Sequence, residues 1–125
     1  MHAHERFVED VLRVVEQIPA GRVMTYGDVA HAVGSRAPRK VGQVMSNYGK
    51  TVPWWRVVPV SGKPPKGHAT LALPHYKSEG TPIAPAAPPE GYRLKLPLAR
   101  LPFDHQVYEG ALQLHLEQDK TDYIL

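Results

Sequence analysis

A run of cationic side chains without any acid is the first feature of the sequence that indicates chemistry. No Asp or Glu lies between Asp28 and Glu79, and the window between them contains the cations Arg36, Arg39, Lys40, Lys50, Arg56, Lys63, Lys66 and Lys77. Such a window favours the binding of a polyanion. A solubilising surface is the alternative, and charge alone does not distinguish DNA from RNA or acidic lipid.

The acids gather instead at the end of the chain. The formal net charge is +3, from 15 Lys and Arg against 12 Asp and Glu. Residues 104–125 contain Asp104, Glu109, Glu117, Asp119 and Asp122 but only one cation, Lys120. From charge alone, we expect this acidic end either to dock onto the basic window or to bind a protein partner.

Cysteine is absent, which excludes disulfides, thiolate metal sites and a cysteine nucleophile from this chain. The histidines are His2, His4, His31, His68, His75, His105 and His115. No pair of them has a zinc-site spacing that further ligands support. The sequence therefore predicts neither a metal nor a cofactor.

Three helices are predicted to position the basic window. Apolar residues at three- and four-residue spacing predict a helix over 5–18, which Pro19 and Gly21 end. Thr25 is a good N-cap, with Asp28 three residues later, for a short helix over 26–33. Pro38 is suited to the first turn of a third helix over 38–47. The second and third helices, joined by a turn that contains glycine, are typical of a helix-turn-helix.

The third predicted helix has two distinct faces. Its inward stripe is predicted to consist of Val41, Val44, Met45 and Tyr48. The opposite face has side chains of the types that contact phosphates and base edges, namely Arg39, Gln43, Ser46 and Asn47. A solvated helix face is the alternative interpretation.

Beyond this helix the sequence predicts smaller elements. We expect a short strand over 56–60, a basic loop over 63–67 and a strand or short helix near 69–77. The proline-rich residues 82–89 are predicted to form a semi-rigid linker. Residues 92–98 alternate like a strand, and residues 104–118 are ambiguous between helix and strand. The predicted fold class is mainly α with a small β element.

Several motifs, in order, resemble the O6-alkylguanine-DNA alkyltransferases. Pro53-Trp54-Trp55-Arg56-Val57 resembles their active-site signature Pro-Cys-His-Arg-Val. Matching segments occur at 18–23, 25–30, 39–45 and 79–80, so that the resemblance covers about residues 7–83. It implies a winged helix-turn-helix DNA-binding domain over 1–83. Residues 84–125 would then be a proline-rich linker and an acidic extension of unknown role.

The departures from the family are as informative as the matches. The family transfers an alkyl group to its cysteine, which a neighbouring histidine assists, but here Trp54 and Trp55 occupy those two positions. Because indole is neither a thiolate nor a useful base, we expect no enzymatic activity. The sequence thus resembles the alkyltransferase-like proteins, which recognise alkylated guanine without repairing it. Members of that group commonly retain the histidine, so Trp55 departs from their pattern.

The resemblance assigns expected roles to individual residues. Arg39 matches the arginine finger that fills the space left by a flipped nucleotide, and Tyr26 matches a tyrosine that rotates the phosphate of that nucleotide. Glu79 matches a glutamate that orients the family's histidine, and without that histidine we expect a structural role. The expected lesion pocket consists of Tyr26, Trp54, Trp55, Arg56, Val57, Val58 and Ser61. The expected DNA-binding residues are Thr25, Tyr26, Arg39, Lys40, Gln43, Asn47, Lys63 and Lys66.

The resemblance implies a DNA damage sensor that flips O6-alkylguanine in double-stranded DNA and flags it for nucleotide excision repair proteins. A winged-helix regulator or architectural DNA-binding protein without lesion specificity is the main alternative, and a glycosylase or residual alkyltransferase is a third. No run of 18 apolar residues and no signal-like N-terminus occur. We therefore expect a cytoplasmic, nucleoid-associated monomer without a membrane partner.

Overall fold

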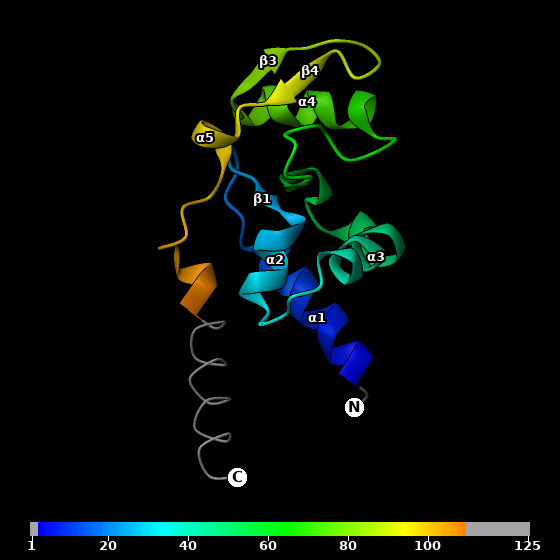
Figure 1. The fold of residues 1–125 in the computed structure, drawn as a ribbon, viewed down its shortest axis with the longest axis vertical. Helices are drawn as coiled ribbons and strands as arrows, with labels where there is room; N and C mark the ends of the chain where they lie inside the picture. Colours follow the sequence, from blue (N-terminus) through cyan, green and yellow to red (C-terminus); the bar gives the residue numbers. More distant parts are fainter. Residues whose placement is uncertain (1–2, 110–125) are drawn as a thin grey trace.

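The computed structural model describes residues 3–109 and shows a mainly helical fold with two small sheets (Figure 1). This confirms the predicted fold class. The helices are α1 (Ala3–Glu16), α2 (Tyr26–Ala32), α3 (Pro38–Tyr48), α4 (Ala69–Glu79) and α5 (Leu96–Ala99). The strands are β1 (Met24–Thr25), β2 (Val57–Val58), β3 (Ile83–Pro85) and β4 (Tyr92–Leu94). None of the helices in this described part has the length and apolar character that crossing a bilayer requires.

Helices α1, α2 and α3 pack around a shared apolar core and form one half of the molecule (Figure 1). Val11, Val29 and Val41, one from each helix, are fully buried there. The predicted C-terminal end of α1 at residue 18 is wrong, because the helix ends at Glu16. The residue before a proline is disfavoured in helical conformation, and Ile18 precedes Pro19. Its side chain is buried in the core all the same.

A short parallel pairing joins this half to the rest of the chain. Strand β1 pairs with β2, with Met24 opposite Val57. The strand predicted over 56–60 is wrong at both ends, because residues Trp54–Arg56 form a 3₁₀ turn and β2 contains only Val57 and Val58. Both valines are buried, which places them behind the surface and not on it.

Helix α4 and the β3–β4 hairpin form the other half of the molecule (Figure 1). The predicted linker is wrong here, because Ile83 pairs with Leu94 and Pro85 with Tyr92 in an antiparallel ladder. A proline is tolerated at the edge of so small a sheet, where its missing N–H removes no necessary bond. Since Tyr92 and Leu94 are buried against α4, the predicted boundary at residue 83 falls inside packed structure.

The segment after the hairpin returns along the first half. Val23 N donates to Ala99 O at 2.9 Å, and Leu101 N donates to Val23 O at 2.8 Å. Leu101, Val107 and Tyr108 belong to the core that α1, α2 and α3 build. Residues 99–108 are therefore part of the fold and not an appendage. The remaining acidic end, with Glu117, Asp119, Lys120 and Asp122, lies outside the described residues.

Candidate nucleic-acid interface

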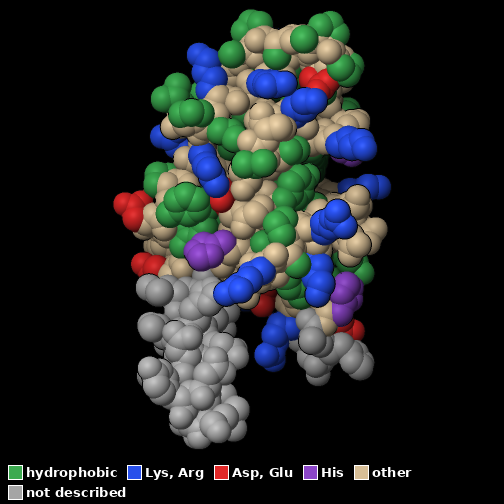
Figure 2. All heavy atoms as spheres, in the orientation of Figure 1, with side chains coloured by type: hydrophobic (Ala, Val, Ile, Leu, Met, Phe, Trp, Pro, Cys, Tyr) green, Lys and Arg blue, Asp and Glu red, His purple; other side chains and the backbone are tan. Residues whose placement is uncertain are grey.

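Helix α3 presents a polar, cationic surface. Arg39, Gln43, Ser46 and Asn47 are exposed, as the periodicity predicts, and Lys40 is exposed as well. Figure 2 shows Lys and Arg side chains on the side where Figure 1 places α3, and also over the upper part of the same face. Outward-facing cations and amides on one helix can bind phosphates and base edges.

The inward stripe of α3 is shorter than predicted. Val41 and Val44 are buried and Met45 is half-buried, but the side chain of Tyr48 is 46% exposed. Its inward assignment is wrong, because the core that covers Val41 and Val44 does not extend to the last turn of α3.

A cavity of about 320 Å³ opens where the two halves of the molecule meet. Its wall is formed by one face of α3, by the loop before α4 and by the first turn of α4. Tyr26 and Trp54 complete this wall. The lining residues are Tyr26, Gly42, Met45, Ser46, Lys50, Trp54, Pro65, Lys66, His68 and Leu71. A flat apolar group can therefore enter between an indole wall and a cationic rim.

Trp54 is the large aromatic surface of this cavity. It is half-buried, and its ring lies edge-on to Trp55 with centroids 5.7 Å apart. His68 and His75, both near or on α4, lie with their rings 5.5 and 6.0 Å from that of Trp54. These neighbours hold the indole in place while part of it stays accessible to a ligand.

Trp55 faces the other way, into a polar network behind the cavity. Its indole Nε1–H donates to Glu79 Oε1 at 3.1 Å, and its ring stacks on His75 with centroids 3.6 Å apart. The hydroxyl of Tyr76 donates to the carbonyl of Trp55 at 2.6 Å. Trp55 thus has a fixed position, with both its polar atoms and its ring engaged.

Glu79 is the acceptor at the centre of this network. Besides the Trp55 indole, it accepts from Arg56 at 2.5 and 3.1 Å and from Gly21 N at 3.3 Å. Burial alone would raise the pKa of Glu79, but hydrogen bonds from Arg56, Gly21 and Trp55 together lower that pKa below its ordinary value. Arg56 also donates to Ile18 O at 2.8 Å. The network therefore fixes the 3₁₀ turn Trp54–Arg56 relative to α4 and the end of α1.

The start of α2 depends on a second charged cluster. Thr25 and Asp28 form the predicted capping box, with both hydrogen bonds at 3.0 Å. Arg100 pairs with Asp28 at 2.7 Å, and although burial opposes ionisation, hydrogen bonds from Arg100 and Thr25 lower the pKa of Asp28. Thr25 is buried, so its predicted contact with DNA is replaced by this capping role. Tyr26, the next residue, projects into the cavity, and burial raises its phenol pKa.

The loop over 61–67 separates the Trp54 cavity from a larger hollow of about 630 Å³. Ser61 and Lys63 line this second hollow, and Lys66 borders both. The hairpin supports the loop, because Leu94 N donates to Gly62 O at 2.8 Å and Lys63 lies 3.7 Å from Glu90. A Cβ at Gly62 would lie 3.0 Å from Leu94 O, and its φ of +82° also favours glycine.

The structure thus divides the expected lesion pocket into two groups. Tyr26 and Trp54 line the cavity, together with Lys66 from the expected DNA-binding set. The others do not line it: Trp55 and Arg56 belong to the network behind, Val57 and Val58 are buried in β2, and Ser61 faces the second hollow. Within the 3₁₀ turn, adjacent side chains point about 120° apart, so Trp54 can line the cavity while Trp55 and Arg56 face the network.

Several residues that line the cavity are not assigned to it by the sequence. Lys50 is predicted only as one cation of the basic window, Leu71 has no predicted role, and His68 is placed only near the position of the family's pocket tyrosine, in a loop whose register the resemblance leaves open. The spacing of three residues between His68 and Leu71, at the start of α4, is the signal that places both on one helix face. No group of three or more potential metal ligands occurs among residues 3–109.

The chain resembles known proteins over most of the described part. The DNA-binding domain of 6-O-methylguanine DNA methyltransferase matches residues 6–78. The "DNA base-flipping protein" of Escherichia coli is 48% identical over 76 residues, which are 58% of this chain and 54% of that protein. A protein of the same name from Vibrio parahaemolyticus is 37% identical over 62 residues, which are 47% of this chain and 62% of that protein. The chain therefore spans about half to three fifths of the length of these curated relatives.

Two solved structures from S. pombe have a similar fold. Atl1 in complex with damaged DNA containing O6-carboxymethylguanine superposes with a TM-score of 0.69 and 31% identity, over 82% of this chain and 99% of that one. A second structure, of ATL in complex with DNA, gives a TM-score of 0.68 and 32% identity over the same shares of the two chains. The similarity extends past residue 83, in agreement with the packing of the hairpin.

Proposed function

Because the chain belongs to the family of the 6-O-methylguanine DNA methyltransferase DNA-binding domain, we propose that it senses damaged DNA without repairing it. In this proposal it binds duplex DNA through α3 and receives an extruded O6-alkylguanine in the cavity beside Trp54. The single observation that carries the proposal is this cavity, which combines an indole wall with a cationic rim.

The cavity suits a flipped alkylated base for physical reasons. Guanine O6 is inaccessible inside a stacked duplex, so a protein that inspects it must extrude the nucleotide. An indole gives the extruded base a π surface and the alkyl group an apolar, polarisable neighbour. Lys50 and Lys66 on the rim are placed to attract the phosphates on either side of that base.

Alkyl transfer by the family's mechanism needs a thiolate, which this chain does not contain. Trp54 occupies the position that resembles the family's cysteine, so the base would meet an aromatic surface and not a nucleophile. A protein that holds a lesion without changing it acts by marking the site. We therefore propose that nucleotide excision repair proteins are its partners, and that Arg39 fills the space left in the base stack.

A binding titration tests the lesion preference. The full chain is titrated with duplexes that differ only in carrying guanine or O6-methylguanine, at one fixed salt concentration. We expect tighter binding to the lesion, and about a tenfold loss of lesion affinity in Arg39→Ala, with Lys95→Gln as a charge-removal control far from α3. Equal affinity for both duplexes overturns the sensor and supports a regulator or architectural protein.

The absence of catalysis has its own test. The chain is incubated with DNA that carries a radiolabelled O6-methyl group, and protein, DNA and solution are then separated. All the label is expected to stay on the DNA. Label on the protein, or released as free base, would restore an enzymatic function.

A further inference from the structure

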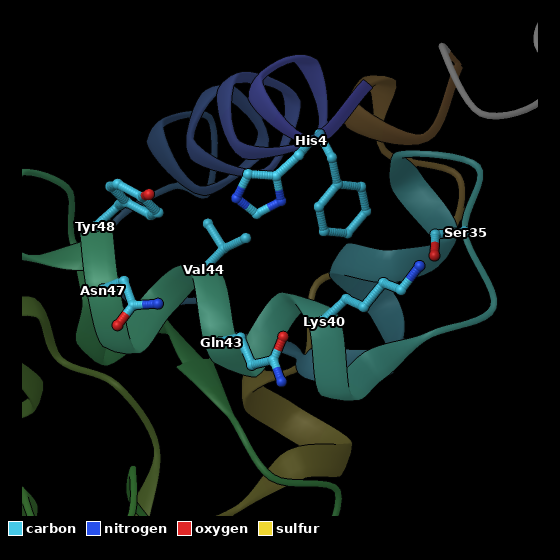
Figure 3. Close-up of a pocket in the computed structure, with 8 residues that line it drawn as sticks. His4, Ser35, Lys40, Gln43, Val44, Asn47 and Tyr48 are labelled. Carbon is cyan, nitrogen blue, oxygen red and sulfur yellow. The ribbon is translucent and has the colours of Figure 1, made fainter. Parts of the chain in front are cut away.

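A second groove, of about 360 Å³, lies on the other flank of α3 from the Trp54 cavity, between α3 and the start of α1 (Figure 3). Lys40, Gln43 and Asn47 line it from α3, and His4 faces them from α1 across Val44 (Figure 3). The cavity on the opposite flank takes different residues of the same helix, namely Gly42, Met45 and Ser46. Helix α3 is thus a ridge with a hollow on each side.

The groove is suited to an anion. Each of its polar lining side chains can donate a hydrogen bond, and none of its lining residues is acidic. Within residues 3–109, the side chains of His4, Lys40, Gln43 and Asn47 have no hydrogen-bond or ion-pair partner. Figure 3 shows the ammonium group of Lys40 extending along the groove toward Ser35. The floor includes the apolar side chain of Val44, which suits a sugar more than a second charge.

We propose that this groove holds the sugar–phosphate backbone of the DNA strand opposite the extruded nucleotide. The inference rests on the proposed function, which places the damaged strand at the Trp54 cavity. A helix with its side chains is about 10–12 Å across, and a B-DNA groove is about 6 Å (minor) to 12 Å (major) wide, so a helix seated at a groove lies between the two backbones that border it. A duplex that lies along α3 therefore presents one backbone to each flank. The start of α1, through His4, becomes part of the DNA interface.

Site-specific cross-linking identifies the strand at each flank. Since the chain contains no cysteine, a single introduced cysteine is the only site that a thiol-directed photoreactive group labels. The two variants are His4→Cys, in the groove, and Leu71→Cys, on the rim of the Trp54 cavity. We expect His4→Cys to cross-link to the strand opposite O6-methylguanine and Leu71→Cys to the strand that contains it. The inference is overturned if His4→Cys labels the damaged strand, or labels neither strand while Leu71→Cys labels one.

A second measurement separates this inference from the proposed function. For Lys40→Gln, we expect the ratio of duplex affinity to single-strand affinity to fall about threefold to tenfold, and the salt dependence of duplex binding to weaken by one phosphate contact. Lys95→Gln, at the far end of the molecule between β4 and α5, should leave this ratio unchanged (Figure 1). An unchanged ratio in Lys40→Gln overturns the inference. Undamaged oligonucleotides give the same readout, so the result holds even if lesion preference fails.

Discussion

The two adjacent tryptophans belong to regions that differ in whether their polar groups are paired within the protein. Trp54 lies in the wall of an open cavity, whose cationic neighbours Lys50 and Lys66 form no ion pair within residues 3–109. Trp55 lies in a closed network, in which Glu79 accepts hydrogen bonds from the indole, from Arg56 and from Gly21. One region leaves its polar groups available for a ligand, and the other satisfies them internally.

This difference shows how the fold separates binding from positioning. A buried polar group without a partner costs free energy, whereas an exposed one costs little, so unpaired donors belong at a surface. The network behind Trp54 is closed, so it can hold the 3₁₀ turn Trp54–Arg56 in one position. The cavity in front can therefore be open while its Trp54 wall keeps one position.

The comparison also explains why a tryptophan is accommodated at position 55. In the family that this segment resembles, a glutamate orients the histidine at that position. Here Glu79 accepts a hydrogen bond from the indole N–H of Trp55 instead. An indole N–H can only donate, which matches an ionised carboxylate. Position 55 therefore still supplies a ring N–H donor to the carboxylate, but it no longer supplies the base that the family's histidine provides.

Glu79→Gln should have the largest effect, on stability. Arg56 and Glu79 have side chains only 16% and 12% exposed, so removing the charge leaves Arg56 without its counter-ion. We expect the free energy of unfolding to fall by about 2–3 kcal/mol, measured by urea denaturation. Asp10→Asn, which breaks the exposed pair with Arg13, is the control and should cost less than about 0.5 kcal/mol. Equal losses in the two variants would show that the network is not a stabilising unit.

The stabilisation by Glu79 should also depend on pH. Because its folded-state pKa lies below the ordinary value of 4.5, its contribution is complete above that value and is lost as the pH falls through the folded pKa. The difference in unfolding free energy between the native chain and Glu79→Gln should therefore be constant from pH 8 to 6 and shrink below about pH 4.5. The pKa of Asp28 is also lowered, so the Asp28–Arg100 pair has a pH dependence of the same sign. Because this pair remains in both proteins, its contribution cancels in the difference. A difference that grows on acidification would contradict this account.

Local signals in the sequence predicted the first half of the fold well. The start of α2 follows from Thr25 and Asp28, which are three residues apart and cap each other through local hydrogen bonds. Pro38 likewise marks the first turn of α3. The exposed face of α3 followed from periodicity, because Val41 and Val44 identify the buried side.

The signals failed where distant residues decide the structure. Residues 82–89 have the composition of a linker, and only the pairing of β3 with β4 makes part of that segment a strand. Trp54 and Trp55 are chemically identical, so composition could not show that one lines the cavity and the other faces Glu79, 24 residues later in the chain. Both outcomes depend on tertiary contacts, which local propensity does not contain.

Replacing the two tryptophans separately tests whether the open cavity at Trp54 and the closed network at Trp55 act as separate regions. Trp54→Ala removes the aromatic wall, and we expect lesion affinity to fall by about 1–2 kcal/mol, or roughly tenfold, as for loss of one stacked base. Trp55→Phe keeps a ring against His75 but removes the donor to Glu79, so it should lower stability by about 1 kcal/mol. Lesion affinity is measured by titration at a temperature where both variants are folded. If Trp55→Phe loses as much lesion affinity as Trp54→Ala, the two regions are not separate.

The smallest expected effect is that of Lys66→Gln, on the rim of the cavity. Lys66 is exposed and borders both hollows, so its charge contributes to attraction without holding the fold together. Loss of one phosphate contact should lower affinity for damaged and undamaged duplexes alike, by a few-fold at low salt, and reduce the slope of log affinity against log salt by about 1. Lys63→Gln is the matched variant from the same loop. Lys63 lies 3.7 Å from Glu90, so it is partly committed to the protein, and its removal should change the slope less. A Lys66→Gln variant that lost only lesion affinity would instead place this cation in direct contact with the extruded base, and would move it from the open surface to the recognition site itself.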